Sequence, residues 1–311
     1  MKQFIKKIAL KIPPIKKLKT ERDALRDERD TLLGEYKFVP PGHFYSAIPS
    51  LEEIRRREKQ IWDVVPDKLP GIDLNTEKQL ICFNEFAAYY EEMPFPDKKN
   101  SLRYYFENPS YSYSDAICLY SMIRKTKPLR IIEVGSGYSS CVMMDTNELF
   151  FSDKIHITFI EPYVDLLLSL MKKDDRSRNT VIPSIVQDVE LDIFGKLEEN
   201  DILFIDSTHV SKIGSDVNHI LFNILPKLNK GVLIHFHDVF YPFEYPKEWI
   251  YGGKAWNEAY VLRAFLQYNT SFEIVFYNTY LELFYADKFK RYMPLCLKNP
   301  GGSIWLRKKG D

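Results

Sequence analysis

From residue 129 onward the chain alternates short apolar runs with longer helical stretches, and this alternation predicts the main fold. Seven runs are typical of buried strands: LRIIEV (129–134), IHITFI (155–160), VIPSIV (181–186), DILFID (201–206), GVLIHF (231–236), FEIVFY (272–277) and SIWLR (303–307). Helical segments separate the first five runs, which is the pattern of a parallel sheet with crossover helices. No long helix separates the last two, so we expect a terminal antiparallel pair. The pattern predicts an α/β, doubly wound sheet of seven strands.

The N-terminal part has a different pattern, in which lysines alternate with apolar residues. Residues 1–19 contain seven lysines and no acid, and Phe4, Ile8 and Ile12 share one face of a helix. Such a basic amphipathic segment favours contact with an anionic membrane surface. A solvated basic tail is the other interpretation. The proline pair that follows keeps this helix short.

Leucines spaced by seven follow the basic segment. Leu18, Leu25 and Leu32 keep this spacing while the charges between them alternate in sign. The spacing indicates a short coiled coil, and therefore a homo-oligomer joined through residues 18–33. Arginines occupy the intervening core positions, so a single charged helix is an equal alternative.

The next segment, residues 36–49, is aromatic and proline-rich, so we expect it to be extended rather than helical. Ser50 and Glu53 then form a capping box that opens a helix. We therefore expect three parts: N-terminal helices over residues 1–35, a helical and extended cap over residues 36–110, and the sheet domain over residues 111–311.

Composition narrows the function classes. Lys+Arg and Asp+Glu both number 43 among 311 residues, and this zero net charge gives no support for nucleic-acid binding. The four cysteines are far apart and form no CxxC pair, which favours free thiols in a reducing compartment. The sequence has no run of 18 apolar residues and no secretory signal. We therefore expect a cytoplasmic protein, with the basic segment as a route to membrane association.

A glycine turn follows the first strand in the stretch IIEVGSGYSS. Gly135 and Gly137 let the backbone turn tightly and approach a ligand at the start of the next helix. Glu133 precedes the turn, where a carboxylate can accept from an ammonium group or a bound water. Glu161 ends the second strand, the position from which an acid binds ribose hydroxyls. A carboxylate at Glu133 would repel a diphosphate but suits a sulfonium and amino-acid ligand.

The succession EVGSG, FIEP, VQDV, LFIDSTH and GVLIHFHD resembles the class I S-adenosylmethionine-dependent methyltransferases, whose Rossmann-like sheet also ends in an antiparallel strand. Within this class the chain is most similar to methyltransferases of bacterial polysaccharide and antibiotic-sugar pathways, some of them metal-dependent sugar O-methyltransferases. The resemblance implies that Gly135, Ser136 and Gly137 line the methionine part of the cofactor, that Glu161 holds the ribose, and that Asp188 lies near the adenine. For Asp188, a solvated loop acid is the alternative.

Acids and histidines follow the fourth and fifth strands. Asp206 and His209 lie three residues apart after the fourth strand, and His237 and Asp238 end the fifth. In a doubly wound sheet these strand ends meet at the ligand-binding edge. The resemblance implies Asp206 and Asp238 as metal ligands and His209 as general base, assisted by Asp206. His237 stands where a magnesium site would have a carboxylate, so we expect a divalent metal at Asp206, His237 and Asp238 that is either magnesium or a transition metal.

The insert after the fifth strand is long and aromatic, and aromatic faces pack well on sugar rings. Its expected pocket walls are Tyr241, Phe243, Tyr245, Trp249, Tyr251 and Trp256. We predict an enzyme that uses S-adenosylmethionine to methylate a hydroxyl of a sugar, a glycan or another small-molecule acceptor. The alternatives are a non-catalytic scaffold in surface-polysaccharide assembly and a nicotinamide-dependent enzyme, which Glu133 disfavours.

Overall fold

The computed structural model describes residues 13–35 and 38–310 and divides into two compact units, residues 1–63 and 64–311. In the smaller unit, α2 covers Pro13–Glu35 and α3 covers Leu51–Trp62. α3 begins after Ser50, whose hydroxyl accepts from the N–H of Glu53 at 3.4 Å, as the capping box predicts. Most of the predicted basic amphipathic segment lies outside the described residues.

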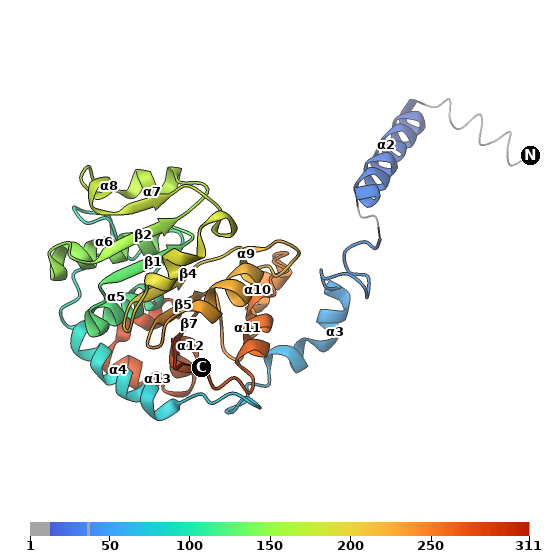
Figure 1. Ribbon diagram of the computed structural model, residues 1–311. Coiled ribbons are helices and arrows are strands. Elements are labelled where there is room, and N and C mark those ends of the chain that lie inside the picture. The colour runs from blue at the N-terminus through green and yellow to red at the C-terminus, as the bar shows by residue number, and fades with distance from the viewer. Residues whose placement is uncertain (1–12, 36–37, 311) are drawn as a thin grey trace, which may run out of the picture. The chain divides into compact units, whose positions relative to one another are not determined.

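The larger unit is built on a mixed sheet, which confirms the predicted fold (Figure 1). Among the described residues its strand order is β3-β2-β1-β4-β5-β7-β6. The first five strands run parallel, and β7 is antiparallel to both β5 and β6. The strands are β1 (Arg130–Val134), β2 (His156–Ile160), β3 (Thr180–Ile182), β4 (Ile202–Ile205), β5 (Leu233–His237), β6 (Phe272–Tyr277) and β7 (Ser303–Lys308).

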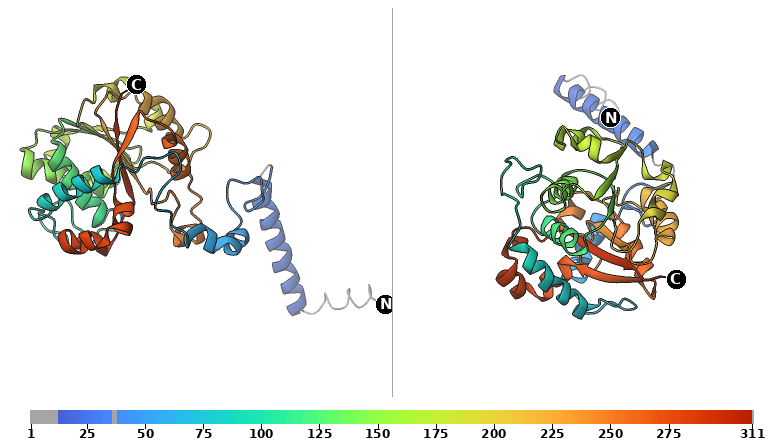
Figure 2. Two further views of the ribbon diagram at one scale, coloured as in Figure 1. Left: turned by 90° about the horizontal axis from the view of Figure 1, so that it is seen from below. Right: turned by 60° about the vertical axis from the view of Figure 1, so that its left-hand side comes forward.

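Helices cover both faces of the sheet, as the turned views show (Figure 2). Three of them, α4, α5 and α6, pack together on one face, while α9, α10 and α11 lie on the other. The α-helices are α4 (Thr76–Tyr90), α5 (Ser114–Thr126), α6 (Tyr138–Phe151), α7 (Asp165–Leu170), α8 (Asp175–Arg178), α9 (Asp216–His219), α10 (Lys247–Tyr251), α11 (Glu258–Leu266), α12 (Asn278–Phe284) and α13 (Ala286–Tyr292). Shorter or irregular turns are η1 (Val186–Asp188), η2 (Leu191–Lys196), η3 (Ile220–Ile224), η4 (Leu225–Lys227) and η5 (Pro294–Lys298).

The predicted boundary at residue 110 does not coincide with the division of the structure. Helix α4 precedes that residue, yet it contacts α5 and the edge strand β6. The segment from 64 to 110 is therefore part of the sheet unit rather than a separate cap. Across residues 13–35 and 38–310, no helix combines the length and apolar character needed to cross a bilayer.

Strand β1 is the point where the strand order reverses, because β2 and β3 are added on one side of it and β4 and β5 on the other. It pairs with β2 on one side and with β4 on the other. Loops that leave neighbouring strands toward opposite faces open a crevice at such a point, at the carboxyl ends of the strands. β4 and β5 are buried along their whole length. The fold therefore offers a rigid platform whose carboxyl edge is the expected place for a ligand.

Candidate active site

A cavity of about 330 Å³ opens at this carboxyl edge. Its walls come from the ends of β1, β2 and β4, from η1, and from the loop after β4. The volume lies at the lower end of the range of ligand-binding clefts. Among the predicted site residues, Gly135, Glu161 and Asp206 line it.

Gly135 is required by the close approach of two strand ends. Its φ of +81° is in the left-handed region, and a Cβ there would lie 2.0 Å from the backbone oxygen of Asp206. Gly137 differs, because its φ of −176° is ordinary extended backbone and its nearest neighbour would be Leu166 at 3.8 Å. We expected both glycines to be needed for the tight turn, but only Gly135 has a backbone angle that requires glycine.

Glu161 holds the glycine loop in place. Its carboxylate accepts from the backbone N–H of Ser136 at 3.0 Å and from that of Tyr163 at 2.7 Å. The acid at the end of β2 thus links the turn after β1 to the loop after β2. Both loops line the cavity through Gly135 and Tyr163.

Glu133 lies deeper than we expected for a residue that meets the cofactor. It is fully buried and accepts hydrogen bonds from the hydroxyls of Ser139, at 2.6 Å, and Ser140, in the first turn of α6. Burial raises the pKa of Glu133 to about 8, although the serine hydroxyls oppose the rise. In this structure Glu133 supports α6 rather than lining the cavity.

Gln187 rather than Asp188 lines the cavity. Asp188 is exposed, whereas Gln187 is among the lining residues. The Gln187 amide donates to the carbonyl of Gly214 at 2.9 Å, and its own buried carbonyl oxygen has no hydrogen-bond partner among the described residues. The placement favours the interpretation of Asp188 as a solvated loop acid.

Asp206 lies between the two predicted histidines. Its Oδ1 atom is 3.3 Å from Nε2 of His209 and 3.3 Å from Nδ1 of His237. Burial alone would raise the pKa of Asp206, but the positive charge and hydrogen bonds of the two histidines hold it well below its usual range. Asp206 therefore stays ionised where it lines the cavity.

His209 is oriented by an acid that the sequence analysis did not find. Its Nδ1 lies 2.8 Å from Oε2 of Glu258, a buried residue that opens α11. Nε2 then faces Asp206 at 3.3 Å and Asp238 at 3.6 Å. Burial would lower the pKa of His209, but hydrogen bonds to Asp206 and Glu258 raise it to about 9.

Two of these residues have unusual backbone angles. His209 has φ +59° and Asp238 has φ +56°, both in the left-handed region. That conformation costs a non-glycine residue about 1–3 kcal/mol and persists where the surroundings hold it in place. The carbonyl of His209 accepts from the N–H groups of Asn257 at 3.0 Å and Glu258 at 3.1 Å, which anchors the loop after β4 to the start of α11.

His237 bridges acids from three elements. Its Nδ1 faces Asp206, while its Nε2 lies 3.5 Å from Oδ2 of Asp115 and 3.8 Å from Oδ1 of Asp238. Asp115 is a buried residue in the first turn of α5, and it also accepts from the amide of Asn278 at 3.0 Å. The role of His237 in this structure is to connect carboxylates, with its pKa raised well above the usual value by Asp238 and Asp206 against the effect of burial.

His235, two residues earlier, is a core histidine. It is fully buried between the ring of Phe204, at 4.0 Å, and that of Trp305, at 4.7 Å. Burial lowers its pKa well below the usual value, so the ring is neutral.

The donor set for a metal differs from the predicted one by one histidine. Donor atoms of Asp206, His209 and Asp238 lie within 4.8 Å of one another, so His209 takes the place expected for His237. Two carboxylates and one imidazole form a donor set that suits a divalent ion. Glu258 on the other nitrogen of His209 is the kind of partner that metal-bound histidines have. The residues present therefore fit a divalent metal.

The aromatic insert divides into two groups. Tyr241, Phe243 and Tyr245 are buried in the core, so they are not pocket walls. Trp256 is half-buried and its ring lies 4.3 Å from that of His209. Trp249 packs on Trp256 at 5.3 Å, which leaves these two rings beside the histidine.

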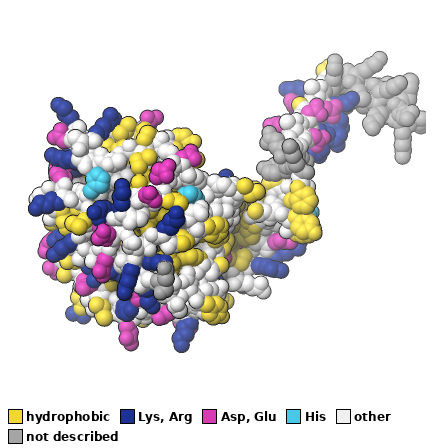
Figure 3. All heavy atoms as spheres, in the orientation of Figure 1, with side chains coloured by type: hydrophobic (Ala, Val, Ile, Leu, Met, Phe, Trp, Pro, Cys, Tyr) yellow, Lys and Arg dark blue, Asp and Glu magenta, His cyan; other side chains and the backbone are white. Residues whose placement is uncertain are grey.

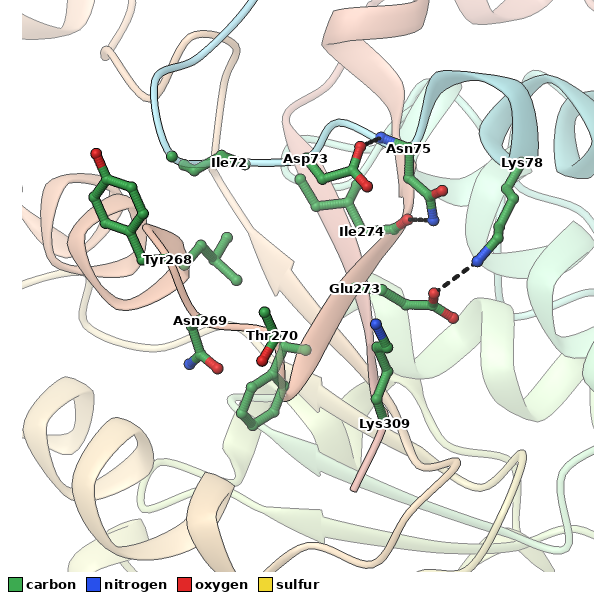
Figure 4. A pocket seen from close by; sticks show the side chains of 13 residues that line it. Ile72, Asp73, Asn75, Lys78, Tyr268, Asn269, Thr270, Glu273, Ile274 and Lys309 are labelled. Atoms are coloured by element: carbon green, nitrogen blue, oxygen red, sulfur yellow. Dashed lines mark hydrogen bonds and ion pairs between the residues drawn. The ribbon is translucent and has the colours of Figure 1, made fainter. Parts of the chain in front are cut away.

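A further cavity, of about 210 Å³, lies at the opposite edge of the sheet (Figure 4). It is lined by the first residues of β6 and by Lys309, which follows β7. Lys78 and Glu273 point toward each other there and form an ion pair at 2.9 Å. Because β6 begins at the amino edge of the sheet, this cavity is separate from the Asp–His cluster, which consists of Asp206, His209 and Asp238.

Part of the chain matches known proteins in sequence. Residues 132–239 match a family model described as a methyltransferase domain. An uncharacterized protein of Archaeoglobus fulgidus is 41% identical over 170 residues, which are 53% of this chain and 76% of that protein. The chain belongs to the same family as this archaeal protein.

Solved structures also align with the chain, at low identity. They include an SAH-bound methyltransferase, PaMTH1, of Podospora anserina (16% identity, 84% of this chain and 97% of that chain, TM-score 0.43). Another is the O-methyltransferase TomG of Streptomyces achromogenes, involved in tomaymycin synthesis and solved with SAM (14% identity, 74% and 90%, TM-score 0.43). Likeness of this degree supports no statement about what the present chain binds or methylates.

The region that matches the methyltransferase domain begins within β1 and ends just after β5. It therefore includes the glycine turn, the residues that line the cavity, and three of the clustered residues, Asp206, His209 and Asp238. The chain therefore belongs to the family of the archaeal protein, and its residues 132–239 match a methyltransferase domain.

Proposed function

We propose that the protein transfers the methyl group of S-adenosylmethionine to a hydroxyl group of a sugar or glycan. The observation that carries the proposal is the setting of His209: Glu258 holds one ring nitrogen, while the other faces Asp206, which lines the cavity. A hydroxyl group is a poor nucleophile until its proton is removed, and a base within reach contributes roughly 10²–10⁴-fold to the rate.

The cofactor would occupy the cavity at the ends of β1, β2 and β4. Gly135 would allow the backbone to approach the ligand, and Glu161, which lines the cavity at the end of β2, would accept from the ribose hydroxyls. The free carbonyl oxygen of Gln187 is an acceptor suited to the amino group of the adenine. Asp206, which stays ionised, would face the sulfonium side of the cavity.

His209 would take the proton of the acceptor hydroxyl at Nε2. In the free site this nitrogen is protonated, because the pKa of His209 is raised to about 9. It must lose that proton before it can act as a base. The methyl group then passes in line from sulfur to oxygen, and much of the rate comes from holding the two reactants in that geometry.

A divalent metal would be held by Asp206, Asp238 and Nε2 of His209. When bound, it would lower the pKa of the acceptor hydroxyl and orient it. The base and the ligand roles use the same nitrogen of His209, so an enzyme molecule can use it for only one of them. Rates measured after exhaustive chelation decide between them: an unchanged rate assigns Nε2 to proton transfer, and a rate restored only by added metal assigns it to the metal.

The aromatic residues beside His209 support a sugar as acceptor. Trp256 and Trp249 form a surface next to the base, and sugar rings pack on such faces. Lys254 covers both rings, with Nζ 3.5 Å from the centre of Trp249 and 4.3 Å from that of Trp256. An acceptor that stacks there would displace this lysine side chain.

The function is tested by binding and by turnover. Calorimetry with S-adenosylhomocysteine should show binding at one site per chain, and an absence of binding would refute the proposal. His209→Gln should bind S-adenosylhomocysteine normally but methylate sugar acceptors about 10²–10⁴-fold more slowly. His156→Gln, at an exposed position on β2, is the matched control and should keep the full rate.

A further inference from the structure

Helix α2 carries two exposed leucines, Leu18 and Leu25, seven residues apart. The side chains of Leu18 and Leu25 are 64% and 65% exposed, and Leu32 continues the seven-residue spacing in the sequence. A lone helix in water gains little from propensity alone, and most helices are stabilised by packing of an apolar stripe. We therefore expect the apolar stripe of Leu18, Leu25 and Leu32 to pack against a second helix.

The charges beside the stripe follow the same repeat. With the leucines at position d of a heptad, Glu21, Glu28 and Glu35 fall at position g, whereas Lys19 and Arg26 fall at position e. One flank of the stripe is thus acidic and the other is mainly basic. The leucine spacing indicates a coiled coil, and the charges at e and g indicate in addition how the two helices are oriented.

The separation selects the orientation of the partner. In a parallel pair, position g of one helix meets position e of the next heptad on the other, so Glu21 of one copy faces Arg26 of the second. In an antiparallel pair, g meets g and e meets e, which would bring like charges together. We propose that two copies of this chain associate through a parallel, in-register, two-stranded coiled coil over residues 18–33.

The residues at heptad position a would make the coiled coil only moderately stable. They are Ile15, Arg22 and Arg29. Polar residues at a cost stability but restrict register and strand number. In the single chain, the Nε atoms of Arg22 and Arg29 donate to Asp23 at 2.9 Å and to Asp30 at 2.8 Å, so both guanidinium groups already have acidic neighbours.

The composition of α2 favours a protein partner over a lipid surface. The helix contains six basic and six acidic residues, and both signs are visible along it in Figure 3. An anionic membrane attracts a helix whose polar face is basic. A helix with balanced charges gains little there, whereas it gains from a second copy with complementary flanks. The association does not depend on the methyltransferase chemistry of the other unit.

Cysteine cross-linking of the full-length chain tests the orientation. The four native cysteines are all buried, so an introduced thiol is the reactive one. Leu18→Cys should form a disulfide-linked dimer under mild oxidation, because equal d positions face each other in a parallel pair. Asp27→Cys, at position f on the outer side of the same helix, is the control and should stay monomeric. Equal or reversed cross-linking of the two variants would overturn the proposal.

Charge reversal tests the pairing itself. By sedimentation equilibrium the full-length chain should dimerise, whereas Glu21→Lys/Glu28→Lys and Lys19→Glu/Arg26→Glu should each dimerise at least tenfold more weakly. Mixing the two variants should restore a dimer, because each then carries the charges that the other lacks. A monomer at all concentrations, including one that binds anionic vesicles, would overturn the proposal. So would charge variants that dimerise as well as the unchanged chain.

Discussion

At the scale of single residues, the site depends on how one histidine is held. His209 occupies a left-handed backbone conformation, is covered on one side by Trp256, and is fixed through Nδ1 by Glu258. Glu258 also accepts from the hydroxyl of Ser207 at 2.8 Å, so its carboxylate is fixed in turn. The acid is a positioning residue, because it acts on the acceptor only through His209.

Glu258→Gln should lower kcat about 10–100-fold, the usual effect of removing a partner that orients a site histidine. The KM for S-adenosylmethionine should stay unchanged, because Glu258 does not line the cofactor cavity. Steady-state kinetics with both substrates measure this split. Glu248→Gln, on the exposed part of α10, should behave like the unchanged enzyme. A change confined to KM would contradict the assigned role.

Glu133 makes a separate prediction about stability and pH. Its pKa rises from an ordinary value of 4.5 in the unfolded chain to about 8 in the folded one. Between these values the folded state binds the extra proton, so the free energy of unfolding falls as the pH rises from about 4.5 to about 8. Glu133→Gln removes this dependence and should be more stable than the unchanged chain at pH 8.5, by on the order of a few kcal/mol.

Thermal unfolding of both proteins at pH 5, 7 and 8.5 measures the difference. The melting temperature of the unchanged chain should decline more steeply over this range than that of the variant. Parallel curves would show that Glu133 titrates alike in the folded and unfolded states, and the assigned pKa would then be wrong.

At the scale of elements, the turn between β1 and α6 is the most constrained connection of the site. Gly135→Ala would place a Cβ 2.0 Å from the backbone oxygen of Asp206 and would strain a φ of +81°. The strand ends must then separate, so the variant should lose S-adenosylhomocysteine binding, measured by calorimetry, and should melt at a lower temperature. Gly195→Ala, where a Cβ meets nothing within 4 Å, is the control. Normal binding by Gly135→Ala would contradict the close approach.

The loop after β4 and the start of α11 form the other constrained connection. The side chain of Asn257 binds the backbone of Ser211 twice: its oxygen accepts from the N–H of Ser211 at 2.6 Å, and its amide donates to the carbonyl of Ser211 at 3.2 Å. These bonds join segments that are 46 residues apart in the sequence. They place Glu258 beside His209, and no local pattern in the sequence indicates that contact.

At the scale of the whole molecule, the division into two compact units predicts that the larger unit folds and binds the cofactor without the smaller one. Residues 64–311 contain the complete sheet, the cofactor cavity and the Asp–His cluster. A protein truncated to these residues should therefore fold cooperatively and bind S-adenosylhomocysteine with an affinity within about threefold of the full chain, because no residue of the cavity lies in the other unit. Calorimetry and thermal unfolding check this. Loss of cofactor binding on truncation would show that the N-terminal unit contributes to the site.

The sequence predicted most of the fold because strands and helices have different periodicities. The seven apolar runs correspond to the seven strands of the sheet. The antiparallel end was also predicted, although the two short helices α12 and α13 lie between β6 and β7, where the sequence pattern indicated no long helix. The division of the chain was harder to predict. Helix α4 reads as part of a cap in the sequence, and only its contacts with α5 and β6 assign it to the larger unit.

The sequence by itself determined which strand ends carry acids and histidines, because parallel strands must end at the same edge of the sheet. Only the tertiary structure decided how these residues group. It placed His209 beside the two aspartates that His237 also contacts, and it brought in Glu258 and Asp115 as further acids. It also buried Glu133 against α6 and placed Gln187 rather than Asp188 in the cavity wall. The reason is physical: the direction of a side chain at a strand end depends on loop backbone angles and on distant packing partners, neither of which a local pattern specifies.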